Sequence, residues 1–220
     1  MTIARTAYLT PTVIEVTLAL PEALSFVPGQ YIRLKMQGEW RAYSVAAMPD
    51  AFTVVIVAQL VDGGRASKEF IAMQPGDRYL MLPPEGWYTY HSGQPACFAG
   101  TGTGIIPCLA MIEGALAQGE RKQLTLLFGA RSQANLFYTD RLDALARRYA
   151  NFTVVYALSR PDPGWTGYEG RVSDYLRQHF QELRAATFYV SAWHETVESL
   201  VALLLKLGVE RSDLHSEYYD

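Results

Sequence analysis

Residues 96–112, ACFAGTGTGIIPCLAMI, carry the strongest structural signal in the sequence. It places a loop of Gly and Thr between an apolar run typical of a buried strand and a run with helical spacing. A loop at the start of a helix exposes backbone N–H groups at the positive end of the helix dipole, where an anion or a pyrophosphate binds. Taken alone, the loop fits a tight strand-to-helix turn as well as a phosphate-binding site.

Two common phosphate-binding motifs do not match this loop. A P-loop requires Lys and Ser or Thr after its last glycine, but Ile105 follows Gly104. A G-x-G-x-x-G motif that begins at Gly102 would need its third glycine at position 107, where this sequence has proline. The next predicted strand ends in Gly129, whereas the motif expects an acidic residue there that binds ribose. If the loop binds phosphate, its pattern is a different one.

The segments around the loop predict two domains. After about residue 93, runs typical of strands alternate with runs of helical spacing, which indicates a parallel open α/β sheet with crossover helices. Before about residue 90, short β-branched and aromatic runs are divided by Pro and Gly, which is typical of a small antiparallel barrel or sandwich. We expect a barrel over 1–92 with one short helix over 67–73, and an α/β domain over 93–220.

Composition excludes several classes of protein. The chain has 220 residues, 50% of them hydrophobic, and a net charge of −3, so it is neither disordered nor a typical nucleic-acid binder. Two Cys are too few for a Cys-ligated cluster, and the four His show no metal-ligand spacing, so we expect no metal. Arg supplies 15 of the 19 cations, which favours paired hydrogen bonds to anions. Because neither a secretory signal nor a membrane-length apolar run is visible, we expect a cytoplasmic protein.

An ordered set of motifs resembles the ferredoxin–NADP reductase family. GTGTGIIP, residues 100–107, resembles the GTGTGIAP segment that receives the nicotinamide and pyrophosphate in that family. The set covers nearly the whole chain and is far more specific than any one member. The other matching segments are FVPGQYIRL (26–34), RAYS (41–44), GGRASKEF (63–70), FGARSQANLFYTDRL (128–142, with Asn135 where Asp is usual) and SRPDPGWTGYEGRVSDYL (159–176).

The resemblance implies an FAD site in the N-terminal domain. Strand alternation places Arg41 and Tyr43 on one face. By resemblance, Arg41 binds flavin phosphate, Tyr43 packs on the isoalloxazine and Ser44 approaches flavin N5. Read without the resemblance, Arg41 is an exposed cation beside a half-buried Tyr, and Ser67 is an ordinary helix N-cap. The other residues that the resemblance assigns to FAD are Ala42, Gly64, Arg65, Ala66 and Ser67.

The resemblance also implies a nicotinamide-nucleotide site in the C-terminal domain. Arg160 resembles the position that pairs with the 2′-phosphate of NADP, which favours NADPH over NADH. Arg131 and Arg160 each follow a predicted strand, and both also fit solvated surface charges. The residues assigned to this site are Gly102, Thr103, Gly104, Pro107, Arg131, Ser159 and Arg160.

The last segments depart from the family pattern. In FYVSAWHETV, residues 188–197, Ser191 replaces the family's Cys and Ala192 its Gly, which implies slower hydride transfer or a place in the flavin-reductase branch. Glu217 resembles the family's C-terminal acid, and Tyr218 or Tyr219 is expected to shield the flavin. The same residues also fit a frayed acidic tail.

The resemblance implies an FAD-dependent oxidoreductase in which hydride passes from NADPH or NADH to flavin N5. The catalytic residues would be Ser44, Ser191 and Glu217. Electrons would then leave to a separate acceptor: a ferredoxin, a flavodoxin, an oxygenase component or free flavin. No Cys pattern of a fused plant-type ferredoxin is visible. Two alternatives are an electron-transfer subunit that works only inside a larger complex, and a nucleotide-binding module without turnover.

Overall fold

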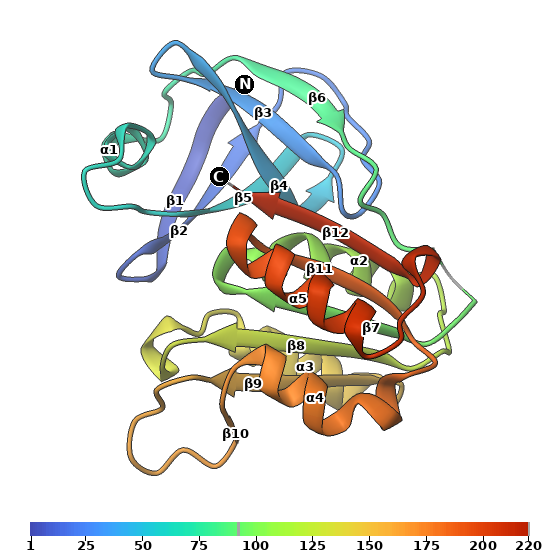
Figure 1. Cartoon of the computed structure of the whole chain (residues 1–220). Helices are drawn as coiled ribbons and strands as arrows, with labels where there is room; N and C mark the ends of the chain where they lie inside the picture. The colour runs from blue at the N-terminus through green and yellow to red at the C-terminus, as the bar shows by residue number, and fades with distance from the viewer. Residues whose placement is uncertain (92, 220) are drawn as a thin grey trace. The chain divides into compact units, whose positions relative to one another are not determined.

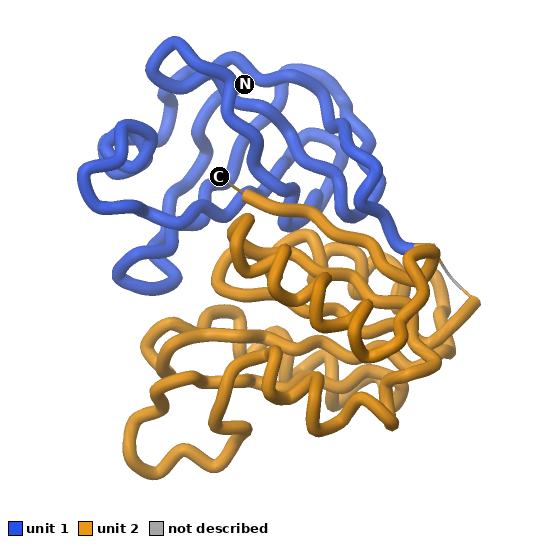
Figure 2. The backbone as a smooth tube through the Cα atoms, in the orientation of Figure 1, with its two compact units in different colours: residues 1–90 blue, residues 91–220 orange. Residues whose placement is uncertain are grey.

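The computed structural model describes residues 1–91 and 93–219. The chain divides into two compact units, Met1–Tyr90 and His91–Asp220 (Figures 1 and 2). The predicted boundary after residue 92 falls on Ser92, which lies outside the described residues. Each unit is described by itself.

The first unit is an antiparallel barrel, as the sequence predicts. Its strands follow the order β1-β2-β5-β4-β3-β6, and every neighbouring pair is antiparallel. Hydrogen bonds between the start of β1 and the segment before β6, such as Ile3 N–H to Asp77 C=O at 2.9 Å, close the sheet on itself. The elements are β1 (Thr2–Thr10), β2 (Val13–Ala19), β3 (Tyr31–Met36), β4 (Glu39–Asp50), β5 (Thr53–Gln59), α1 (Arg65–Ala72) and β6 (Met81–Glu85).

The barrel core forms from alternate residues of each strand, because successive side chains point to opposite faces. Ile14, Val16 and Leu18 of β2 are fully buried, and α1 adds Phe70 to the same core. Pro83 and Pro84 lie within β6. A proline lacks the N–H that sheet pairing uses, and β6 tolerates it because it is the last strand in the hydrogen-bonded order.

The short helix begins two residues earlier than predicted. Its N-cap is Gly64, and Ser67 lies inside the first turn, so the prediction of Ser67 as N-cap is wrong. The Ser67 hydroxyl instead accepts a hydrogen bond of 2.8 Å from the backbone N–H of Val61. Glycine has no side chain to cap a helix, and no side chain caps the first turn of α1 among the described residues.

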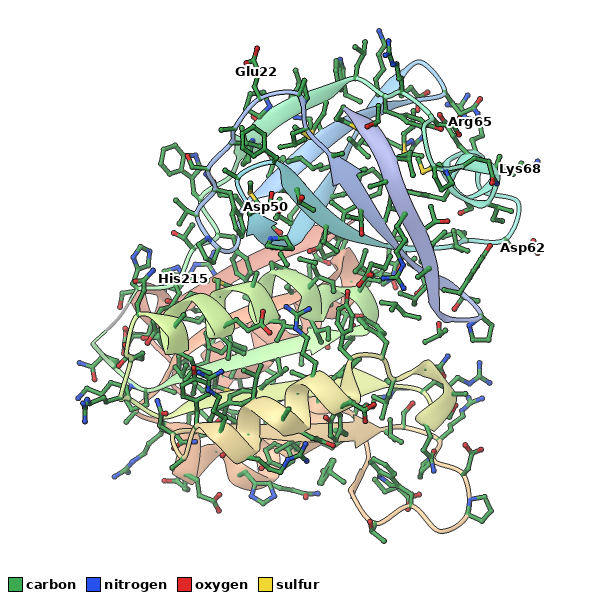
Figure 3. All side chains as sticks on the ribbon, turned by 180° about the vertical axis from the view of Figure 1, so that it is seen from behind. Glu22, Asp50, Asp62, Arg65, Lys68 and His215 are labelled. Atoms are coloured by element: carbon green, nitrogen blue, oxygen red, sulfur yellow. The ribbon has the colours of Figure 1, made fainter. Side chains whose placement is uncertain are left out.

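The second unit is a parallel six-stranded sheet with helices on both faces, as predicted. The strand order is β10-β9-β8-β7-β11-β12. Helices α4 and α5 pack on one face, and α2 and α3 lie on the other (Figures 1 and 3). Among the described residues, no helix is long and apolar enough to cross a membrane. The elements are β7 (Ala96–Thr101), η1 (Gly102–Gly104), α2 (Ile105–Ala117), β8 (Leu124–Ala130), η2 (Gln133–Asn135), α3 (Thr139–Arg148), β9 (Phe152–Leu158), β10 (Tyr168–Glu169), α4 (Val172–Leu183), β11 (Thr187–Trp193), α5 (His194–Lys206), η3 (Arg211–Asp213) and β12 (Leu214–Tyr219).

The C-terminal segment is a strand, not a frayed tail. Strand β12 pairs in parallel with β11 over six residues, from Phe188 opposite Leu214 to Trp193 opposite Tyr219. The ring of His215 stacks on Tyr189 of β11, with 4.9 Å between the ring centroids. This pairing fixes Glu217, Tyr218 and Tyr219 along the edge of the sheet.

Candidate functional site

A tight hairpin turn aligns the candidate flavin residues of the first unit. Strands β3 and β4 are joined by Gln37 and Gly38, with φ of 50° and 82°, and Met36 pairs with Glu39 across the turn. Two consecutive positive φ values match the short hairpin turns that suit the twist of paired strands. Because side chains alternate along β4, Glu39, Arg41 and Tyr43 share one strand face, as the sequence predicts for Arg41 and Tyr43.

Arg41 and Arg65 converge on a single carboxylate. Arg41 Nη2 donates to Glu39 Oε2 at 2.7 Å, and Arg65 Nη2 pairs with the other oxygen, Glu39 Oε1. Arg65 is the first residue of α1, so its backbone belongs to the first turn of that helix. Arg41 Nε is buried and has no hydrogen-bond partner among the described residues. We call Arg41, Arg65 and the first turn of α1 the cationic cradle; Figure 3 labels Arg65 within it.

The chemistry of the cradle fits a phosphate group. Two guanidinium groups and a helix N-terminus supply positive charge and several N–H donors, which suit an anion with several oxygens. Two carboxylate oxygens already accept hydrogen bonds there, so the spacing of the donors is right for an oxyanion. Gly64, Ala66 and Ser67 belong to this segment, and their backbones form the start of α1.

Tyr43 and Ser44 follow Arg41 on opposite faces of β4. The ring of Tyr43 meets Phe70 edge-on at 5.2 Å, and its hydroxyl donates to Met36 Sδ at 3.2 Å. Burial raises the pKa of Tyr43 to about 12, so the phenol stays protonated at neutral pH. Ser44 is buried, whereas Ala42 is exposed.

In the second unit, the glycine loop packs against the end of β11. Gly102 has φ of +53°, a left-handed conformation that favours glycine. A Cβ at Gly104 would lie 2.2 Å from the carbonyl oxygen of Ser191, so only glycine fits there. Thr103 completes the short η1 turn, and Pro107 lies in the first turn of α2. The loop thus lies between β7 and the start of α2, where the sequence predicts it, and Gly102 and Thr103 are partly exposed.

Two arginines lie on adjacent loops at the same sheet edge. The backbone N–H of Arg160 donates to the carbonyl of Arg131 at 2.8 Å, and Ser159 N–H donates to Ala130 at 3.1 Å. Ser159 and both arginine side chains are exposed. Because carboxyl ends of parallel strands meet at one edge, these residues share that edge with Gly102–Gly104.

Gln133 joins the two arginine-bearing loops. Its amide oxygen accepts from Asp162 N–H at 2.8 Å, and its Nε2 donates to the Asp162 carbonyl at 3.3 Å. These two hydrogen bonds between Gln133 and the Asp162 backbone hold the segment after Arg160 against η2. No pattern in the sequence indicates this role of Gln133, because a hydrogen bond from a side chain to the backbone of a distant residue leaves no local signal.

Ser191 is fully buried beside the glycine loop. Its neighbours Val190 and Ala192 belong to the core covered by α5, so Ser191 points to the other face, on which α2 lies. Its Oγ has no hydrogen-bond partner among the described residues. A buried hydroxyl without a partner costs free energy, so it marks a position where a ligand atom is the natural partner.

We expect Ser191→Ala to stabilise the chain. Removing an unpaired buried hydroxyl removes its desolvation penalty, which we put at about 1 kcal/mol of unfolding free energy. Chemical denaturation measures this change, and Ser216→Ala on the exposed side of β12 is the matched control. A loss of stability with Ser191→Ala would show that the hydroxyl is already satisfied in the folded chain.

The candidate residues of β12 lie beside Ser191. Glu217 is opposite Ser191 in the parallel register. Tyr218 meets the ring of His194 edge-on at 4.5 Å, and the Tyr219 hydroxyl donates to Glu217 Oε1 at 3.5 Å. In the described part of the chain, no group of three or more His, Cys, Asp or Glu side chains is placed to hold a metal ion.

The fold and these sites define a class: a two-unit oxidoreductase with one site for a flavin and one for a nicotinamide nucleotide. Residues 1–90 match the family model of the oxidoreductase FAD-binding domain, and residues 98–193 match that of the oxidoreductase NAD-binding domain. Ferredoxin–NADP reductase B of Sorangium cellulosum is 34% identical over 216 residues, which covers 90% of this chain and 87% of that protein. The chain therefore belongs to the ferredoxin–NADP reductase family, and FAD and NADP or NAD are its cofactors.

Two further relatives extend the comparison. The reductase component DmpP of phenol 2-monooxygenase from a Pseudomonas species is 33% identical over 181 residues; the match covers 78% of this chain and 51% of that protein. A ferredoxin NADP⁺ reductase from Neisseria gonorrhoeae, solved with bound FAD and NADP, has a TM-score of 0.84 and 26% identity, and covers 99% of this chain and 96% of its own.

Proposed function

We propose that the chain passes electrons from NADPH or NADH through bound FAD to a separate protein, either a ferredoxin or an oxygenase component. One observation carries the proposal: each unit has its own candidate anion-binding site. In the first unit it is the cationic cradle, and in the second it is the glycine loop with Arg131 and Arg160 on adjacent loops. The names of the Sorangium and Pseudomonas relatives support these two classes of acceptor.

In the first unit, the chain binds and orients the flavin. Arg41 and Arg65 donate to phosphate oxygens, and the first N–H groups of α1, at Arg65, Ala66 and Ser67, complete the phosphate site after Gly64. Tyr43 and Ser44 would hold the flavin ring from β4. FAD supplies the redox chemistry, since it takes up hydride and passes electrons on.

In the second unit, the chain binds and orients the nicotinamide nucleotide. The backbone of Gly102, Thr103 and Gly104, ahead of Pro107, holds the pyrophosphate. Arg131 and Arg160 bind the 2′-phosphate of NADPH. Ser159, which precedes Arg160 after the end of β9, belongs to the same site. Ser191 Oγ gives a hydrogen bond to the nicotinamide end and so fixes its position.

Reversing the charge of Arg160 should change the preference between NADPH and NADH. We expect Arg160→Glu to raise the KM for NADPH by about 100-fold and the KM for NADH by less than about threefold, because only NADPH carries the 2′-phosphate. Steady-state reduction of a dye acceptor by each nucleotide measures the two constants. Arg121→Glu, before the opposite end of β8, is the control. Equal effects on both nucleotides would refute the role of Arg160.

The proposed acceptor is tested by direct electron transfer. The purified chain, loaded with FAD and supplied with NADPH, is mixed without oxygen with a plant-type or bacterial [2Fe–2S] ferredoxin, and reduction is followed by absorbance. We expect the ferredoxin to be reduced with saturation kinetics at micromolar concentration. Reduction of free flavin alone, with no transfer to the ferredoxin, would instead assign the chain to the flavin reductases.

A further inference from the structure

Glu39 carries a function that neither the fold nor the comparisons assign. Its carboxylate bridges Arg41 and Arg65, the two side chains that bind flavin phosphate in the proposed function. One carboxylate oxygen pairs with each guanidinium, so Glu39 occupies the donors that the phosphate needs. We propose that Glu39 is a built-in competitor of the flavin phosphate, which weakens FAD binding and keeps the flavin exchangeable.

The backbone places Glu39 for this role. It is the first residue of β4 and follows the two-residue turn at Gln37–Gly38, so its position is set by the hairpin rather than by a flexible loop. Strand alternation puts it on the same face as Arg41, two residues along. Arg65 comes from a different element, the start of α1, and lies 26 residues away in sequence.

The charges of the cradle indicate that the Glu39 carboxylate competes with the flavin phosphate and does not help to bind it. Arg41 and Arg65 supply two positive charges, and Glu39 cancels one of them. The hydrogen bond from Arg65, ahead of the attraction of both guanidinium groups, holds the pKa of the Glu39 carboxyl below its usual value, so it is ionised at neutral pH. An ionised carboxylate repels a negatively charged diphosphate that approaches the same two guanidinium groups.

The carboxylate is also free to move aside. The Glu39 side chain is 52% exposed, and Arg65 is 61% exposed, so solvent screens the pair and makes it weak. Arg41 is less exposed, at 38%, and its Nε is a further buried donor that has no hydrogen-bond partner in the described part of the chain. A phosphate that displaces Glu39 gains that donor, which the carboxylate does not use.

The test is the rate at which FAD leaves the loaded chain. The loaded protein is diluted, and the release of FAD is followed by the recovery of its fluorescence. We expect Glu39→Gln, which keeps the shape and removes the charge, to slow release and lower the Kd by about three- to tenfold at low salt. The difference should shrink at about 1 M salt, where charges are screened within about 3 Å.

Two variants make the result decisive. Glu39→Asp keeps the charge and should stay close to the unmodified chain. Glu22→Gln removes one exposed carboxylate of the same unit, at a distance from Arg65 (Figure 3), and should change nothing. Faster or unchanged release with Glu39→Gln overturns the proposal.

The inference rests on the proposed flavin site, and the two can fail separately. If Arg41→Ala with Arg65→Ala leaves FAD binding intact, the flavin site itself is misassigned. If that double variant loses FAD but Glu39→Gln does not tighten binding, only the competition by Glu39 is refuted.

Discussion

Replacing Arg41 and Arg65 together with Ala is expected to abolish retention of FAD. Each guanidinium gives a charge-assisted hydrogen bond to phosphate, worth about 1.5–3 kcal/mol. Losing both weakens binding by about 10²- to 10⁴-fold. Glu39 would also be left unpaired next to the phosphate and add repulsion. The ratio of flavin absorbance to protein absorbance after gel filtration measures retention, and titration with FAD measures the Kd.

The control for this double variant removes the same charge elsewhere on the first unit. Arg5 lies on the exposed side of β1, and Arg78 is an exposed residue before β6. Arg5→Ala with Arg78→Ala should keep the flavin content unchanged, which separates the loss of local donors from a loss of net charge. Unchanged flavin in the Arg41 and Arg65 variant, with the fold intact by circular dichroism, would contradict the site.

Gly104→Ala should have the second largest effect, on use of the nicotinamide nucleotide. The added Cβ would meet the Ser191 carbonyl oxygen at 2.2 Å and its carbon at 2.7 Å, and both are backbone atoms that cannot turn away. The loop must therefore shift, and a shift of about 1 Å in a positioning element costs about 100-fold. We expect kcat/KM for NADPH to fall by about that factor while FAD content stays near one per chain.

Gly102→Ala provides the matched comparison for Gly104→Ala. A Cβ at Gly102 meets no atom of residues 1–91 or 93–219 within 4 Å, so the penalty comes from its φ of +53°. A left-handed residue costs about 1–2 kcal/mol, so its effect on kcat/KM should be several times smaller. If both variants lose equal activity, the contact between the loop and Ser191 is not what requires glycine.

The sequence predicts the two-unit architecture well because its signals are local. Alternating strand and helix patterns follow from side-chain periodicity, and the glycine loop follows from the conformational freedom of its residues. The neighbouring loops of Arg131 and Arg160 follow from the rule that parallel strands end at one edge. These predictions do not depend on contacts between residues that lie far apart in the sequence.

Other features depend on contacts that a linear pattern does not encode. Strand β12 is short and polar, and it is a strand because β11 offers an edge with which it pairs. The Ser67 hydroxyl pairs with Val61 rather than with the helix, which reverses its expected role. Glu39 shares a strand face with Arg41 and was overlooked, because its second partner, Arg65, comes from another element.

The most direct test of the whole account is an anaerobic titration of the purified chain with NADPH. We expect a yellow protein with one FAD per chain, whose flavin absorbance is bleached by one equivalent of NADPH. Addition of an oxidised acceptor should restore the colour. A colourless protein that neither binds added FAD nor oxidises NADPH or NADH would contradict the account.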